Sequence, residues 1–434
     1  MAPTRRRLLA ALTATGAVTA AGCLDRSNGT SNDGGTDDGT DDSGTNGDGS
    51  APDGETDDSD TDTGTEIQVD LGVPCAETDG DVDLFEGQRP TDIEGAQAAP
   101  ETDYGDGEIP LRDDRLYLGH DIERFAEEHI NGGVNHDGIP SIDEPEFLPA
   151  ADAELPPCER VFGVSIDGDV RAYPQRILVR HEVVNDVVGG RPVAVTYCPL
   201  TGTAQGFYRG GVEFGVSGEL VNSNLIMWDR AFDVRWPQVA ATGVEVGGER
   251  GAGGADLVGR SLQEFRVVWT TWERWRDRHP ETLLMTADTG FARNYSRDPY
   301  GSYTPVSGHY AVGTSRRPDF PLLAAPESDE KRVVLGARTT DGAIAVEKRT
   351  LLEDSVLTGT IGDTPVVAVA DEGLSTGYVY ANPDALDVTR DGEEYVVDGD
   401  AAPAGDLPLE SIVAFEAMWF VWHGYYPDTE RVGI

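Results

Sequence analysis

Hydrophobic and polar positions alternate along short runs from about residue 159 onward, and glycine, proline and aspartate separate these runs. Alternation with a period of two is typical of β-strands that bury one face. The runs Val161–Ile166 and Val170–Tyr173 flank Asp167-Gly168, which predicts a tight hairpin. The pattern predicts a mainly β fold of the β-rich α+β class, with two related β-rich halves packed as one domain and helical insertions.

A second predicted hairpin, His181–Cys198, has Gly189-Gly190 between its two β-branched arms. Two-residue turns of types I′ and II′ require positive φ, so a Gly-Gly pair is a strong signal for them. If these glycines are the central turn residues, His181 lies opposite Cys198, with Asn185 on the same face. A slip of one residue would place the thiol and the imidazole on opposite faces.

The hairpin pattern recurs later in the chain at a constant offset, which aligns Gly189 with Gly362 and Pro192 with Pro365. We call this spacing the hairpin offset. Positions shared by the two copies are apolar or turn-forming, as a scaffold requires. The chemically reactive positions are not shared. The second copy is therefore predicted to be structural, because it has other residues at these positions: Asp354 for His181, Thr358 for Asn185 and Asp371 for Cys198.

Residues 67–434 are predicted to form a single folded domain. We expect a first repeat at about 159–230, an insertion at about 231–330 and a second repeat at about 331–434. Short helices are expected near Asp121–Ile130 and after Thr271, where Thr-Thr-Trp-Glu resembles a capping box. The apolar tail Ser411–Tyr426 is expected to be a buried helix or strand. The tryptophans of the insertion predict a buried seam rather than an exposed ligand platform: Trp269, Trp272 and Trp275.

The N-terminal segment 1–23 resembles a twin-arginine export signal, with Arg5 to Arg7 before a short apolar run. The run ends Ala-Ala-Gly-Cys, which predicts lipidation of Cys23 and attachment to the outer face of the cytoplasmic membrane. An ordinary cleaved signal is the alternative. Residues 24–66 carry 14 acids, one base and no aromatic residue, so we expect a disordered acidic tether.

The remainder of the chain is also acidic, because residues 67–434 hold 65 acidic and 29 basic residues. The net charge of the whole chain is −46. Phosphate groups would be repelled, so we expect no nucleic-acid partner and membrane contact only through the lipid. An acidic surface that stays soluble in concentrated salt fits a halophilic source.

Cys75, Cys158 and Cys198 remain when Cys23 is set aside. In an oxidising compartment the simplest pairing is Cys75 with Cys158, which leaves the Cys198 thiol free. A Cys158–Cys198 disulfide is the alternative, and it would remove that thiol.

Three hypotheses describe the hairpin site. In the first, a thiol-dependent enzyme uses Cys198 as nucleophile, His181 as general base and Asn185 to orient the imidazole. The loop from Pro199 to Thr203 would supply backbone amides for an anion or oxyanion. The residues predicted to support this site are Glu182, Asp186, Thr201 and Gly202.

In the second hypothesis, His181 and Cys198 bind zinc or copper. Further ligands would come from elsewhere in the chain, although Glu182 and Asp186 point away from His181 in a regular strand. The third hypothesis is a non-catalytic surface protein that binds a ligand or partner through the insertion. The further ligand candidates of the metal hypothesis are Glu182, Asp186, Asp229, His309 and His423.

We expect no nucleotide cofactor, because the glycines between Gly247 and Gly254 lack a following Lys-Ser/Thr and a preceding apolar strand. Ser165, Ser217 and Ser223 do not lie in a G-x-S-x-G elbow, so the sequence does not predict a serine hydrolase.

Several phrases match one family in order: AYPQRIL, HEVVND, VTYCPLTGTA, FGVSGELVNSNLIMWDR and WFVWHGYYPDTE. The chain resembles the exported family catalogued as domain of unknown function 3179 over most of residues 137–434. The resemblance implies no established activity. Members commonly read CPLC at the motif, whereas this chain has Thr201 in place of the second cysteine, so no CxxC redox pair can form here.

Overall fold

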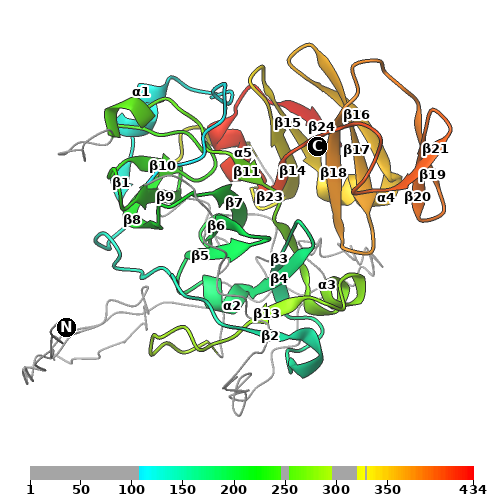
Figure 1. The fold of residues 1–434 in the computed structure, drawn as a ribbon. Coiled ribbons are helices and arrows are strands. Elements are labelled where there is room, and N and C mark those ends of the chain that lie inside the picture. The colour runs from blue at the N-terminus through cyan, green and yellow to red at the C-terminus, as the bar shows by residue number, and fades with distance from the viewer. Residues whose placement is uncertain (1–106, 246–253, 296–319, 328–329) are drawn as a thin grey trace, which may run out of the picture. The chain divides into compact units, whose positions relative to one another are not determined.

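The computed structural model describes residues 107–245, 254–295, 320–327 and 330–434 (Figure 1). The chain divides into the units Met1–Thr63 and Gly64–Ile434, and every described residue belongs to the second unit. The predicted export signal, the lipidation site at Cys23, the acidic tether and Cys75 lie outside the described residues. Sheets dominate and the helices are short, so the mainly β prediction is confirmed.

The first half of the fold, which we define as the elements from Arg160 to Met285 together with the edge strand Phe147–Pro149, is built on two hairpin sheets. Their pairings are antiparallel, except that Leu283–Met285 runs parallel to Asp169–Pro174. One sheet has the order β12-β3-β4-β13-β2, and the other has the order β11-β7-β6-β5. Their strands are β2 (Phe147–Pro149), β3 (Arg160–Ile166), β4 (Asp169–Pro174), β5 (Val183–Val188), β6 (Arg191–Cys198), β7 (Thr203–Tyr208), β11 (Glu264–Phe265), β12 (Val268–Thr271) and β13 (Leu283–Met285).

A further sheet of order β1-β8-β9-β10 forms between β7 and β11 in the chain, apart from its edge strand β1. Its strands are β1 (Ile130–Asn131), β8 (Phe214–Val221), β9 (Asn224–Asp229) and β10 (Arg235–Pro237).

The second half, from Val333 to Val432, repeats the two hairpin sheets with the orders β23-β14-β15-β24 and β16-β17-β18-β22. A small sheet, β19-β20-β21, takes the place of the additional sheet of the first half. The strands are β14 (Val333–Arg338), β15 (Ala343–Glu347), β16 (Val356–Ile361), β17 (Thr364–Asp371), β18 (Thr376–Ala381), β19 (Val388–Asp391), β20 (Glu394–Val397), β21 (Asp400–Pro403), β22 (Glu410–Ile412), β23 (Ala414–Met418) and β24 (Glu430–Val432).

The two halves share strand register as well as strand order. Cys198 faces Thr203 across β6 and β7, and Asp371 faces Thr376 across β17 and β18, at the hairpin offset. The similarity found in the sequence therefore corresponds to a structural repeat.

The segment that returns to each first sheet repeats at a shorter spacing, which we call the return offset. β13 places Leu283 beside Arg171, and β24 places Glu430 beside Ile344. Arg171 and Ile344 are related by the hairpin offset, so Leu283 and Glu430 are equivalent positions. The repeat thus includes the returning strands.

This register corrects the boundary of the predicted insertion at about 231–330. The pairings of β11, β12 and β13 place residues 264–285 in the sheets of the first half. They correspond to residues 411–432, which the same prediction assigned to the second repeat. A search at one fixed offset missed this segment, because the connection that precedes it differs in length between the halves.

A buried tryptophan on a glycine anchors each half. Trp275 packs on Gly163 and Trp422 packs on Gly336, and a Cβ atom at either glycine would overlap the indole ring. Each indole Nε1 donates to a threonine Oγ1 seven residues further on, at 3.0 Å in the first half and 3.1 Å in the second. The buried tryptophan seam expected from the sequence is confirmed.

Replacing either glycine by alanine should therefore destabilise the protein. We expect Gly163→Ala and Gly336→Ala each to lower the free energy of unfolding by about 1–3 kcal/mol, the usual cost of overpacking. Denaturant unfolding in concentrated salt measures this. Gly163→Ala should cost less when it is combined with Trp275→Phe, whose smaller ring leaves room for the methyl group.

The helices are α1 (Ile122–Glu127), α2 (Gln175–Leu178), α3 (Trp272–Arg278), α4 (Lys348–Asp354) and α5 (Trp419–Tyr425), with 3-10 turns η1 (Ala150–Asp152) and η2 (Gly254–Leu257). The predicted helices near residues 121–130 and after Thr271 form, although the Thr271 side chain makes no capping hydrogen bond. The apolar tail becomes β22, β23 and α5. No helix among the described residues is long and apolar enough to cross a membrane.

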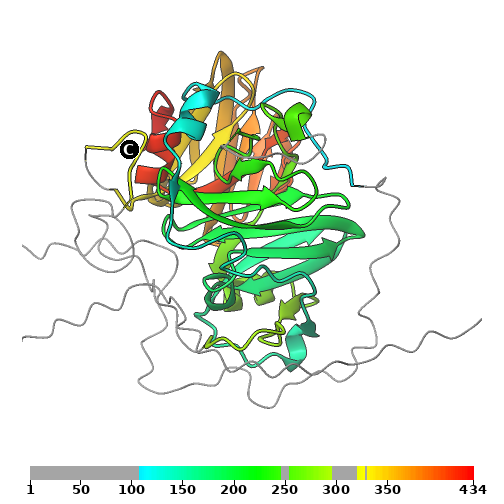
Figure 2. The same ribbon diagram turned by 90° about the vertical axis from the view of Figure 1, so that its left-hand side faces the viewer.

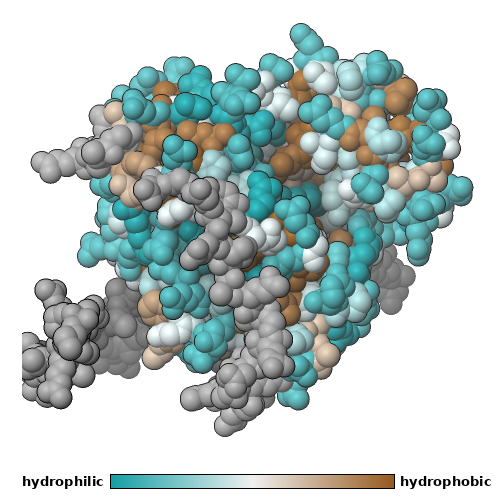
Figure 3. Space-filling model, viewed as in Figure 1, coloured by the Kyte–Doolittle hydropathy of each residue, from teal (hydrophilic) through white to brown (hydrophobic). Residues whose placement is uncertain are grey.

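Helix α5 belongs to the second half by sequence, but it lies against the first half in both ribbon views (Figures 1 and 2). Asn222 at the β8–β9 turn donates its Nδ2 hydrogen to the Val421 carbonyl at 3.0 Å. On the face drawn in Figure 3, hydrophilic residues predominate and hydrophobic residues form smaller groups. The docking of α5 brings residues of the second half to the hairpin of interest.

Candidate functional site

The hairpin of β5 and β6 forms as the sequence predicts. Gly189 and Gly190 have φ values of 58° and 74°, and Val188 pairs with Arg191. Positive φ at both central residues is the signature of a type I′ turn. The register of the ladder is therefore the predicted one.

The first strand of the hairpin begins later than the alternation suggested and does not include His181. β5 begins at Val183, and Glu182 has a φ of 61° because it ends the turn of α2, where its amide donates to the Leu178 carbonyl at 2.7 Å. The equivalent Ser355 has a φ of 69°, so this left-handed residue belongs to the repeated scaffold. Positive φ interrupts the strand geometry, and His181 does not follow the two-residue alternation.

The His181 ring has two hydrogen-bond partners, and neither is Cys198. Nδ1 donates to the Pro140 carbonyl at 2.7 Å, because a carbonyl can only accept. Nε2 of the neutral ring must then accept from the Tyr295 hydroxyl at 2.5 Å, and that hydroxyl also contacts Thr289 Oγ1 at 2.6 Å. Burial lowers the pKa of His181 to about 4. The imidazole is thus held neutral in one tautomer.

Asn185 joins two strands instead of orienting the imidazole. Its Nδ2 donates to Asp143 Oδ1 at 2.7 Å and to the Phe214 carbonyl at 2.8 Å, and its Oδ1 accepts from the Phe214 amide at 3.0 Å. The predicted arrangement of Cys198, His181 and Asn185 is not assembled by any of these contacts. The physical reason is the helix end at Glu182, which the periodicity did not reveal.

The Cys198 thiol is free and only 1% exposed, within a cluster that includes Val183 and Phe214. Sγ lies 4.0 Å from the Ser223 carbonyl. Burial, followed by the nearby Glu182 carboxyl, raises the thiol pKa to about 12. The ionisable side chain that acts on the thiol is therefore Glu182 rather than His181.

The Glu182 side chain is partly accessible to solvent, although protein atoms surround it closely. Burial alone raises the pKa of its carboxyl to about 8, with no compensating cation. A carboxyl with such a pKa keeps its proton in neutral solution. The first half thus places a protonated acid beside a protonated thiol.

The loop after Cys198 is held by hydrogen bonds within the protein. Thr201 Oγ1 donates to the Cys198 carbonyl at 3.4 Å and accepts from Asn224 Nδ2 at 3.0 Å. Gly202 has a φ of 54°, and the equivalent Ser375 has a φ of 53°, so this turn also belongs to the scaffold. Thr201 and Gly202 therefore support the position of Cys198 through the backbone.

Cys158 is disulfide-bonded, which excludes the alternative Cys158–Cys198 pairing because the Cys198 thiol is free. Its predicted partner, Cys75, lies outside the described residues, so that pairing stays a prediction.

The predicted metal ligands are dispersed among other partners. Asp186 accepts from Arg171 and from the Tyr173 hydroxyl at 2.6 Å. Asp229 accepts from the Trp236 indole at 2.9 Å, while the His423 ring contacts Trp419 at a tilt of 37°, with ring centroids 5.1 Å apart. His309 lies outside the described residues. Among the residues that the structure describes, no group of three histidine, cysteine or acidic side chains could hold a metal ion.

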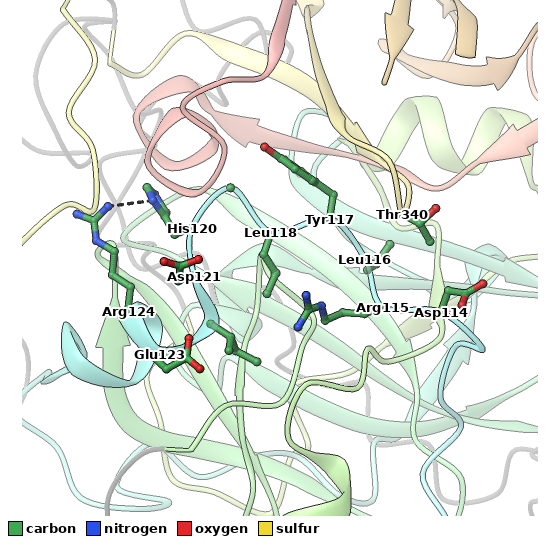
Figure 4. A pocket seen from close by; sticks show the side chains of 12 residues that line it. Asp114, Arg115, Leu116, Tyr117, Leu118, His120, Asp121, Glu123, Arg124 and Thr340 are labelled. Carbon is green, nitrogen blue, oxygen red and sulfur yellow. Dashed lines mark hydrogen bonds between the residues drawn. The ribbon is translucent and has the colours of Figure 1, made fainter. Parts of the chain in front are cut away.

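An open depression of about 1060 Å³ lies elsewhere on the surface, lined by residues 114–124 and Thr340 (Figure 4). His120 Nε2 donates to the Gly424 carbonyl at 2.7 Å, and His120 Nδ1 accepts from Arg124 at 2.9 Å. These contacts attach the segment to α5. None of the residues predicted for the hairpin site lines this depression.

The sequence did not indicate that Tyr295 and Asn224 are hydrogen-bond partners of the hairpin, because each reaches the hairpin through a tertiary contact.

The sequence profile of a family described as "Protein of unknown function (DUF3179)" matches residues 136–429. The curated proteins and the solved structures contain no match to this chain.

Proposed function

We propose that this chain, which belongs to the DUF3179 family, is a lipid-anchored extracytoplasmic protein that binds a ligand or partner without catalysing a reaction. The twin-arginine pattern, the lipobox ending at Cys23 and the acidic tether support export and anchoring. The disulfide at Cys158 is consistent with an oxidising compartment.

The state of Cys198 carries the non-catalytic part of the proposal. The nucleophile of a thiol enzyme is the thiolate, and a thiol with a pKa of about 12 is ionised at neutral pH in only about one molecule in 100,000. His181 cannot assist, since Pro140 and Tyr295 occupy both of its nitrogens. The buried thiol then behaves as a small apolar side chain.

The binding surface was expected in the insertion, and Phe291, an exposed aromatic side chain in the described part of that segment, supports this. Its side chain is 41% exposed and its ring lies 5.3 Å from that of His181. The tryptophans of the same region are buried and cannot serve as a ligand platform. We therefore place the ligand contact at Phe291, beside His181.

A second candidate is a thiol-dependent enzyme in which Glu182, rather than His181, assists Cys198. The observation that favours it is the strongly shifted Glu182 carboxyl next to the thiol, because perturbed acids cluster at functional sites. The third candidate, a zinc or copper protein, would bind its metal at Cys198 and displace the thiol proton.

One experiment separates the three candidates: alkylation of Cys198 by iodoacetamide in the folded protein in concentrated salt, combined with metal analysis. We expect alkylation at neutral pH to be at least about 1,000-fold slower than in denaturant, where the thiol has its ordinary pKa. Cys198→Ala is the control that identifies the modified residue.

The other outcomes contradict the binding proposal. Rapid alkylation with a midpoint near pH 8 would support the enzyme with Glu182 as its base. One equivalent of metal per chain that is lost in Cys198→Ala would support the metal protein.

A further inference from the structure

In the second half, the hairpin of β16 and β17 ends at Asp371, and Arg278 faces this end. Asp371 ends β17, and its carboxylate accepts two hydrogen bonds from Arg278, at 2.9 Å and 3.1 Å. The Leu374 amide also donates to this carboxylate at 3.0 Å. Arg278 is the last residue of α3, so a helix of the first half reaches across to the second half.

The two offsets of the repeat convert this ion pair into a prediction for the first half. Asp371 corresponds to Cys198 at the hairpin offset, and Tyr425 corresponds to Arg278 at the return offset. Tyr425 is the last residue of α5, just as Arg278 is the last residue of α3. The two helices thus cross between the halves in a reciprocal way.

The contacts of Tyr425 agree with this correspondence. Its hydroxyl donates toward Asn224 Oδ1 at 3.3 Å and the Val221 carbonyl at 3.4 Å. Asn224 in turn donates to Thr201, in the loop that follows Cys198. Burial raises the pKa of the Tyr425 hydroxyl, and the neighbouring Tyr426 and Cys198 side chains raise it further.

The docking of α5 leaves little freedom at this position. A Cβ atom at Gly424 would overlap the Asn222 side chain, so the helix approaches the β8–β9 turn as closely as glycine permits. Asn222 and Ser223 both have positive φ at this turn, with values of 53° and 60°. The Ser223 carbonyl of this turn lies 4.0 Å from Cys198 Sγ.

We infer that Tyr425 is a third member of the site that contains Glu182 and Cys198, and that both halves of the chain build this site. The inference goes beyond the proposed function, because it concerns how the two halves enclose the Cys198 thiol and does not depend on what binds at Phe291. It revises the expectation that the second copy is purely structural. Tyr425 acts as a positioning residue, because its hydroxyl connects α5 to Asn224, which holds the loop after Cys198 through Thr201.

The test exchanges the first-half residue for its second-half counterpart. In Tyr425→Arg the guanidinium would lie beside Cys198, as Arg278 lies beside Asp371, and would stabilise the thiolate against the opposing Glu182 carboxyl. We expect alkylation of Cys198 at neutral pH to accelerate at least about 100-fold, and the thiolate absorbance to appear at least about two pH units lower. Arg278→Tyr is the matched control and should leave both readouts unchanged.

A second measurement covers the case in which Tyr425→Arg does not fold. Cys198→Asp combined with Tyr425→Arg would recreate the second-half ion pair, so the double variant should be more stable than its single variants predict, by at least about tenfold in the unfolding constant. An unchanged thiolate titration together with no coupling overturns the inference, and so does a double variant no better folded than the single ones. The wild-type alkylation rate tests the proposed function separately.

Discussion

Glu182→Gln should stabilise the protein at alkaline pH, although it replaces only a carboxyl by an amide of the same shape. We expect its free energy of unfolding to exceed that of the wild-type protein by about 3 kcal/mol above about pH 8. This difference in free energy is smaller than the one that a pKa shift from 4.5 to about 8 would give on its own. Solvent reaches part of the Glu182 side chain and weakens the effect.

The sign follows from where the proton is bound. Below about pH 4.5 the carboxyl is protonated in both states and makes no difference to stability. Between about pH 4.5 and pH 8 the unfolded chain releases the proton while the native state retains it. Native Glu182 therefore lowers stability progressively as pH rises through this window, and the amide cannot.

Denaturant unfolding over this pH range, in concentrated salt, measures the effect through midpoint and slope. The control is Glu144→Gln, which removes a carboxyl from an exposed position and should leave the pH dependence unchanged. If Glu182→Gln and the wild-type protein keep parallel curves up to about pH 8, the carboxyl is solvated and ionised in the native state. The description of the site as a protonated acid beside a thiol would then be wrong.

The sequence predicted local features of the site well. The Gly189-Gly190 turn determined the register, and the register placed Asn185 opposite Ala194 as the structure has it. The repeat was visible because both halves need the same apolar and turn residues. These features depend on neighbouring residues or on a constant spacing, and both can be read from the chain.

Other features of the site depend on tertiary contacts. His181 meets Tyr295, 114 residues further along the chain, and Tyr425 reaches Asn224 from a distance of 201 residues. The positive φ at Glu182 interrupted the strand alternation, and a glutamate gives no signal for positive φ. The return offset was hidden by the different insertions that the two halves carry.

The differences between the halves are more informative than their similarities. The buried Asp371 is paired with Arg278, whereas the positions that correspond to these two residues hold the Cys198 thiol and the Tyr425 phenol, with the protonated Glu182 nearby. Ion pairing gives the second half a charged, internally satisfied contact. The first half instead has groups that can exchange protons, and pH should act on it more strongly.

The contribution of His181 to the free energy of unfolding should have the opposite pH dependence to that of Glu182, so the two contributions can be measured separately. Burial lowers its pKa from 6.5 to about 4, so the neutral ring contributes stability that is fully present above about pH 6.5. As pH falls from there to about pH 4, the unfolded chain binds a proton that the native state does not, and about 3 kcal/mol is lost.

His181 and Glu182 contribute opposite slopes to the wild-type stability profile between about pH 4.5 and pH 6.5, and these slopes largely cancel. Relative to the wild-type protein, the free energy of unfolding of His181→Gln should decline by about 1.4 kcal/mol per pH unit as pH rises. That of Glu182→Gln should increase relative to the wild-type protein by about 1 kcal/mol per pH unit, and the double variant should return close to the wild-type slope. Unfolding curves of the four proteins measure these slopes independently of any constant cost from lost hydrogen bonds to Tyr295 and Pro140. A wild-type profile that rises steadily through this window, and stays the same in Glu182→Gln, would show that His181 alone titrates abnormally.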